Sequence, residues 1–143
     1  MKILFIAFLI FFQINPAFSY DENDFMKKFD SLNTTFIIQS TNFFSEVDKL
    51  NKLAKEPNVN SDNLQLLYVT SAQSLCITVI ALEKSQSLIG KNPQVIGSFL
   101  TKDDVNEVNY KTSVFKRYLK EFGLDNQGCK DMMPYTYDSI MNN

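Results

Sequence analysis

Two long stretches without glycine or proline, residues 22–54 and 58–89, constrain this chain more than any other feature of its sequence. Glycine and proline are the strongest breakers of regular structure, so each stretch can form one continuous helix. In the first stretch one stripe recurs every three or four positions, the period of an amphipathic helix. The stripe consists of Phe25, Phe29, Leu32, Phe36, Ser40, Phe43, Val47, Leu50 and Ala54. Such an aromatic stripe is more typical of a core than of a ligand site, and Pro57 ends the long N-terminal helix.

The second stretch predicts a helix that is buried on most sides. Ser61 or Asp62 can cap its N-terminus, and Gly90, just beyond Leu88, suits its C-terminal end. Residues 75–82 are apolar almost all round. Their β-branched members would also suit a strand, but the length of the unbroken stretch favours a helix. We expect it to be the central helix of the fold.

A third helix is predicted after Thr101, an N-cap residue followed in the first turn by Asp103 and Asp104. Acidic side chains there interact favourably with the helix dipole. An apolar stripe then runs through residues 105–122, and Gly123 ends the helix.

Shorter elements complete the prediction. Proline at the first helical position suggests a short turn of helix in residues 93–100. Residues 124–128 are expected to be irregular, and residues 129–141 to add a short helix that starts or breaks near Pro134. The predicted fold class is all-α, a small four-helix-type bundle with one long N-terminal helix, tied by a single disulfide.

The first 19 residues have the three parts of a cleavable signal peptide. Lys2 precedes ten apolar residues, 3–12, and the small residues Ala17 and Ser19 stand at −3 and −1 of a cut. Ten apolar residues are about half of what a membrane-spanning helix needs, although an uncleaved anchor or a buried N-terminal helix is the alternative. A cut after Ser19 leaves residues 20–143 as a single helical domain without a membrane anchor, either secreted or periplasmic.

The chain has two cysteines, Cys76 and Cys129. In an exported protein a single pair of cysteines predicts one structural disulfide, because the compartment is oxidising. The CxxC spacing of a catalytic redox pair is missing, and the alternative is two free thiols.

Histidine is absent, which removes the commonest catalytic base and the commonest transition-metal ligand. No cofactor motif is present either, so no cofactor and no metal are expected. A carboxylate-based hydrolase could use Asp103 and Glu107, four apart on one helix face, but charge compensation at the helix N-terminus explains them equally. The net charge is −2 and Arg117 is the single arginine, so no nucleic-acid partner is expected.

The C-terminal segment is the predicted interaction surface. It combines two methionines with two tyrosines, residue types that are enriched in interface cores: Met132, Met133, Tyr135 and Tyr137. The alternative is that these side chains cover the open end of the helical bundle. Asn33-Thr34-Thr35 fits the acceptor sequence for N-glycosylation and falls inside the first predicted helix.

One resemblance supports a binding role. Cys129-Lys130-Asp131-Met132, together with Cys76 in an earlier apolar helix, resembles the periplasmic helical immunity proteins that neutralise type VI secreted amidases. The resemblance implies an exported, disulfide-bearing protein that plugs the active site of an enzyme. The long first helix departs from the family's pattern, so no functional residue is carried over.

These observations predict a non-enzymatic protein that binds another protein by surface complementarity, possible roles being those of an inhibitor or immunity protein. The alternative is a carrier that holds a hydrophobic small molecule or lipid between its helices. A carboxylate-based hydrolase is the third hypothesis.

Overall fold

The computed structural model describes residues 21–133, 136 and 139. It contains four α-helices in this part of the chain: α1 (Glu22–Leu53), α2 (Ser61–Lys91), α3 (Lys102–Glu121) and α4 (Asn126–Met132), with a 3₁₀ turn η1 (Pro93–Val95) between α2 and α3. No strand occurs among these residues, so the prediction of an all-α chain is confirmed. The predicted signal peptide lies outside the described residues.

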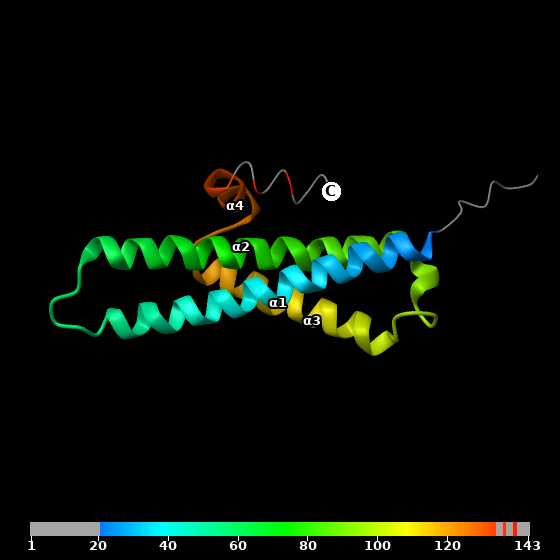
Figure 1. Cartoon of the computed structure of the whole chain (residues 1–143), viewed down its shortest axis with the longest axis horizontal. Helices are drawn as coiled ribbons and strands as arrows, with labels where there is room; N and C mark the ends of the chain where they lie inside the picture. The colour runs from blue at the N-terminus through cyan, green and yellow to red at the C-terminus, as the bar shows by residue number, and fades with distance from the viewer. Residues whose placement is uncertain (1–20, 134–135, 137–138, 140–143) are drawn as a thin grey trace, which may run out of the picture.

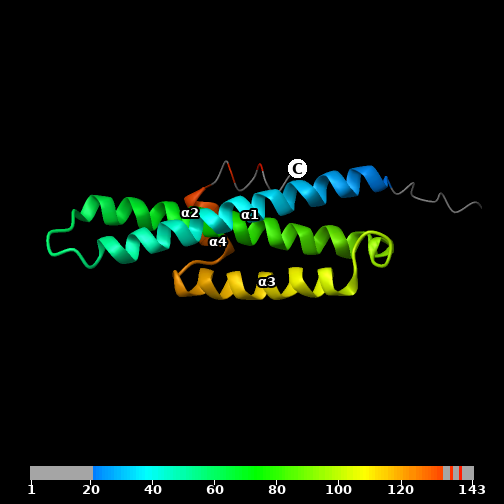
Figure 2. The ribbon, with the colours of Figure 1, turned by 60° about the horizontal axis from the view of Figure 1, so that its bottom comes forward.

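Helix α2 is the centre of the fold. It forms a long antiparallel hairpin with α1, while α3 and α4 lie along other sides of it (Figures 1 and 2). Between residues 71 and 82 every side chain of α2 is buried except two that are half-buried. The prediction of a central, buried helix is therefore confirmed. By length and hydropathy α2 could also cross a membrane, but half of its most apolar window is buried in the fold, as is typical of a core helix.

Small polar residues let α1 approach α2 closely. Buried members of α2 recur every three or four positions on one face: Ser71, Ser74, Thr78, Ala81 and Ser85. Ser74 donates a hydrogen bond to Glu46 of α1 (3.0 Å), which places this face against α1. Three of the hydroxyls donate to backbone carbonyls one turn earlier in α2, at 2.7–2.9 Å. They are buried at little cost because each has a partner.

The ends of α2 differ from the sequence prediction. Asn60, rather than Ser61 or Asp62, is the N-cap, and its side chain accepts the backbone N–H of Asp62 at 2.8 Å. Gly90 lies inside the helix instead of beyond its end. Proline disfavours helical geometry in the residue before it, so the helix ends at Asn92, directly before Pro93.

The segment between α2 and α3 also corrects the sequence prediction. Only the 3₁₀ turn η1 forms, and the predicted helix does not continue to Leu100. Gly97 has a φ of 92°, a conformation that side-chain-bearing residues rarely adopt, and its N–H donates to the carbonyl of Leu100 at 2.7 Å. Val95 and Leu100 fill a small core with Phe25 of α1 and Ile89 of α2, which fixes this end of the molecule.

Helix α3 begins where the sequence predicts. Thr101 and Asp104 form a reciprocal capping box in which Asp104 accepts the Thr101 hydroxyl and backbone N–H, both at 2.7 Å. The side-chain hydrogen bond from Thr101, followed by the backbone one, lowers the pKa of Asp104. At the other end Gly123 has a φ of 71°, the left-handed conformation that ends helices.

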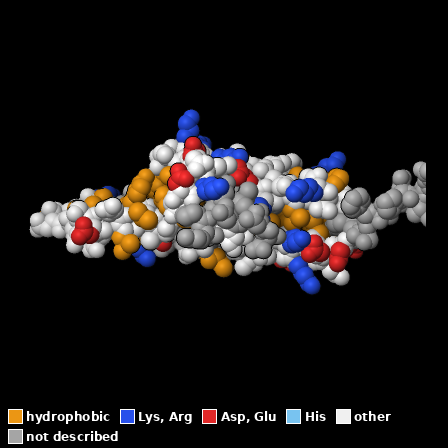
Figure 3. Space-filling view, turned by 90° about the horizontal axis from the view of Figure 1, so that it is seen from above, with side chains coloured by type: hydrophobic (Ala, Val, Ile, Leu, Met, Phe, Trp, Pro, Cys, Tyr) orange, Lys and Arg blue, Asp and Glu red, His pale blue; other side chains and the backbone are white. Residues whose placement is uncertain are grey.

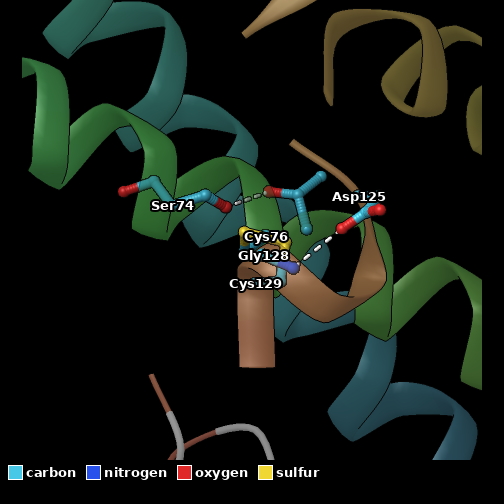
Figure 4. The surroundings of a disulfide bond; sticks show 6 residues. Ser74, Cys76, Asp125, Gly128 and Cys129 are labelled. Atoms are coloured by element: carbon cyan, nitrogen blue, oxygen red, sulfur yellow. Dashed lines mark hydrogen bonds between the residues drawn. A yellow bond between two sulfur atoms is a disulfide. The ribbon is translucent and has the colours of Figure 1, made fainter. Parts of the chain in front are cut away.

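A disulfide between Cys76 and Cys129 joins α4 to α2 (Figure 4). Its Cα atoms are 5.6 Å apart, and both cysteines are almost fully buried, so the predicted pairing is confirmed. Helix α4 begins three residues earlier than predicted, because Asp125 caps it by accepting the N–H of Gly128 at 2.8 Å. Most of the predicted helix 129–141 lies outside the described residues.

Candidate protein interface

Aromatic side chains join α1 to α3. No Cα atom of α1 lies within 8 Å of α3, so bulky rings span the distance between the two helices. Phe36 meets Phe115 edge-on, with ring centroids 5.7 Å apart. Phe43 is 2% exposed and contacts Phe115, Tyr118 and Phe122 at centroid distances of 5.5–6.4 Å. Phe43 is therefore the buried centre of the aromatic contacts.

Phe44 extends this cluster to the surface. Successive residues of a helix are about 100° apart, so Phe44 cannot share the buried face of Phe43. Its ring contacts Phe115 and Tyr118 at 5.8 and 6.0 Å, while 49% of the residue stays exposed. One half of the ring is thus fixed by the core and the other half is open to solvent.

Tyr68 of α2 reaches the same place from another helix. Its ring stacks on Phe122 at 5.4 Å, and its hydroxyl donates to the Phe122 carbonyl at 2.8 Å. That carbonyl belongs to the C-cap residue of α3, where backbone acceptors lack partners within the helix. Tyr68 therefore caps α3 and remains 42% exposed.

Together these side chains form a surface that we name the aromatic patch. Its members come from three helices: Phe44 of α1, Tyr68 of α2, Tyr118 of α3, and Phe122 at the C-cap of α3. Two are exposed and two are half-buried, and the buried ring of Phe43 supports three of them. The patch lies where α3 ends and the α1–α2 hairpin continues past it (Figures 1 and 2).

Charged groups border the aromatic contacts. The Arg117 guanidinium lies 6.0 Å from the centroid of Tyr118 and 3.9 Å from Glu121. The Lys111 ammonium lies 5.0 Å from the centroid of Phe36 and 2.6 Å from Glu107. Apolar aromatic centres with a polar, charged rim are typical of protein interfaces.

Other hydrophobic side chains also reach the surface. Figure 3 shows one such group over the hairpin end of the molecule, with charged residues spread between it and the opposite end. At the opposite end of the hairpin, burial lowers the pKa of Lys84, and the charges of Lys91 and Lys28 lower it further. No three His, Cys, Asp or Glu side chains of the described residues gather in a way that could hold a metal ion.

The structure places the C-terminal candidates unequally. Met133 is 7% exposed and packs in the same core cluster as Cys129, and Met132 is half-buried against that cluster. Both methionines thus lie where the alternative interpretation placed them, over the end of the bundle. Tyr135 and Tyr137 lie outside the described residues.

The acidic pair considered for catalysis lies at the solvent-exposed N-terminal end of α3. Asp103 and Glu107 are both exposed, and Glu107 forms its ion pair with Lys111 of the same helix. Both positions suit the charge compensation and surface pairing expected of a solvated helix face.

Sequence reasoning did not identify the aromatic patch. The helical stripe of α1 includes Phe43 and omits Phe44, although two adjacent phenylalanines signal that one must leave the buried face. Tyr68 and Tyr118 carry no signal of this kind, because their partners come from helices distant in sequence.

A scan against protein-family models finds no match, and neither the search of curated proteins nor the search of solved structures finds one. The resemblance to immunity proteins therefore gains no support from these comparisons. The proposal below rests on the geometry of the patch.

Proposed function

We propose that this chain is an exported protein-binding domain and that the aromatic patch is its binding surface. The observation that carries the proposal is the convergence of half-exposed aromatic rings from three helices on one place. Tyrosine and phenylalanine are enriched in interface cores, and rigidly held rings lose little entropy when they bind. Because Phe43 and the Tyr68 hydrogen bond hold the rings, the surface is preorganised for a partner.

Export is supported by two independent features. The first 19 residues have the pattern of a signal peptide, and the disulfide between Cys76 and Cys129 suits an oxidising compartment. In this proposal the exported domain is a compact helical bundle that binds its partner outside the cytoplasm, as an inhibitor or immunity-type protein would.

The contacts between α1 and α3 favour surface binding over a ligand held between the helices. The rings of Phe36, Phe43 and Phe115 contact one another, so protein side chains fill the space that a lipid or other hydrophobic molecule would need.

A photo-cross-linking experiment tests the proposal. We would replace Phe44 with p-benzoylphenylalanine in the mature chain and irradiate it with extracellular extract of its source. Tyr110 is the matched control, because it is an aromatic residue of α3 that is 70% exposed and eight positions before Tyr118. We expect a discrete protein adduct from position 44 and none from position 110. Excess unlabelled wild-type chain should compete the adduct away, and excess Phe44→Ala chain should not.

Three results would contradict the proposal: adducts of equal yield from both positions, no adduct from position 44, or equal competition by the Phe44→Ala chain. Circular dichroism and the urea midpoint of each variant show whether the fold survives, so that a failed cross-link can be assigned to binding.

A further inference from the structure

The acceptor sequence Asn33-Thr34-Thr35 stays outside the function proposed above, and the structure gives it a definite place. It lies in the first half of α1, and both Asn33 and Thr34 are exposed. No other Asn-X-Ser/Thr triplet with X other than proline occurs in the 143 residues. An N-linked glycan is bulky and polar and needs a surface position, which Asn33 has.

A hydrophobic residue lies directly beside this position. Ile37 is one turn after Asn33 on the same face of α1, and it is 53% exposed. Helical side chains lean over the preceding turn, so Ile37 leans toward the backbone of Asn33. A sugar ring has an apolar face as well as hydroxyls, and a ring linked to Asn33 can lie over Ile37 and shield it from water.

We propose that Asn33 is an N-glycosylation site and that the first sugar of the glycan covers Ile37. The inference rests on the export that we propose above, because the modification takes place in the secretory pathway. The co-reactant is an oligosaccharide linked to a lipid pyrophosphate. The Asn33 Nδ2 bonds to the anomeric carbon and loses a proton, the bond from that carbon to the pyrophosphate oxygen breaks, and the lipid pyrophosphate leaves.

The reaction precedes folding of α1. In the folded chain the Thr35 hydroxyl donates to the carbonyl of Ser31 at 2.9 Å, so it is engaged within the helix. The nascent chain is extended when it enters the secretory pathway, and there the whole acceptor sequence is free. Once folded, α1 carries the glycan on its exposed face without loss of a core contact.

The glycan leaves the aromatic patch open. Phe44 is eleven residues after Asn33, about 16 Å further along α1 at 1.5 Å per residue. A partner bound at the patch would therefore meet the glycan at one edge of its footprint. The modification would limit the direction from which a partner approaches.

The test is secretion of the full chain from a eukaryotic host, once with its own first 19 residues and once with a leader of the host in their place. Intact mass spectrometry before and after peptide N-glycosidase digestion reads the modification. We expect a heavier protein whose excess mass the enzyme removes, with the Asn33 side chain deamidated in the tryptic peptide. Asn33→Gln and Thr35→Ala should abolish the excess mass. Thr35→Ser should retain it, and so should Asn42→Gln, which changes an exposed asparagine of the same helix outside the acceptor sequence.

The two versions separate this inference from the proposed export. If only the host leader gives secreted protein, the export proposal fails while occupancy of Asn33 can still be measured. Secreted protein with an unmodified Asn33 overturns the inference. To test the role of Ile37, an endoglycosidase would trim the glycan to one sugar. We expect a higher melting temperature than for the fully deglycosylated protein, and the difference should vanish in Ile37→Ser. An equal difference in Ile37→Ser would refute the contact.

Discussion

The disulfide between Cys76 and Cys129 offers the sharpest test of how this fold is stabilised. The bond joins two residues 53 positions apart, and the loop it closes contains all of α3. In the chain-entropy account, closing a loop of this length in the unfolded state is worth about 4 kcal/mol. Replacing both cysteines with alanine should therefore lower the free energy of unfolding by about 3–5 kcal/mol, since the packing of two buried sulfur atoms is lost as well.

The structure indicates how this loss would be distributed. Helix α4 has only seven residues, and it contributes Cys129 to the main core, with Met133 directly after it. Without the bond, such a short helix is marginal and should detach before α1, α2 and α3 unfold. We therefore expect methionine signals from α4 in NMR spectra to broaden at urea concentrations where the far-ultraviolet dichroism of the long helices is unchanged.

Urea denaturation followed by circular dichroism measures the total effect. The melting midpoint should also fall by roughly 10–15 °C, at about 3–4 °C per kcal/mol for a domain of this size. The double-alanine variant with and without reductant is the control, because reductant should leave its midpoint unchanged. If the variant and the oxidised wild type unfold at the same urea concentration, the loop-closure argument is refuted.

Three further substitutions test separate parts of the fold, each by the urea midpoint. Phe43→Ala should cost about 3–5 kcal/mol, because it removes the buried centre of the aromatic contacts, and a loss below 1 kcal/mol would contradict its central position. Thr101→Ala should cost about 0.5–2 kcal/mol at pH 7. Because Thr101 lowers the pKa of Asp104, its stabilisation is present above the ordinary carboxyl pKa and is lost as the pH falls through the lowered one. The gap between wild type and Thr101→Ala should therefore narrow in acid, and a constant gap would argue against the capping box. Ser74→Ala should cost about 1–2 kcal/mol by removing the bond to Glu46, and an unchanged midpoint would show that water replaces it.

The sequence predicted the helices well because their determinants are local. The period of apolar residues and the absence of glycine and proline define α1 and α2 over more than eight turns each. Thr101 followed by Asp104 specifies the start of α3 within four residues of chain. The disulfide was predictable from compartment and cysteine count, because only one pairing exists for Cys76 and Cys129.

Helix ends that depend on competing local signals were predicted less well. Gly90 is a weaker breaker than Pro93, and the proline acts through the residue before it, so α2 continues past the glycine to Lys91. Asn60 outcompetes Ser61 as the cap of α2 because its carbonyl oxygen reaches the N–H of Asp62. Either choice satisfies the propensity of cap residues, and only the path of the incoming chain decides between them.

The candidate site could not be predicted, because it depends on how helices distant in sequence align. Tyr68 meets Phe122 across 54 positions, and nothing near Tyr68 in the sequence announces this partner. The C-terminal segment looked more suitable for binding by composition, yet the disulfide draws Cys129 into the core and brings Met133 with it. Residue type predicted stickiness correctly there, whereas burial was decided by a covalent bond to another helix.

Phe43 and Phe44 show how one sequence pair can serve both stability and recognition. Because the rings contact each other at 5.2 Å, the exposed ring is held by the same core that the buried ring fills. A surface aromatic ring on a flexible segment would lose conformational entropy on binding, whereas Phe44 has already lost most of it on folding. The core therefore bears the entropic cost of ordering the patch before any partner arrives. For this reason substitution of Phe43 should weaken both folding and binding, while substitution of Phe44 should weaken binding with little effect on the fold.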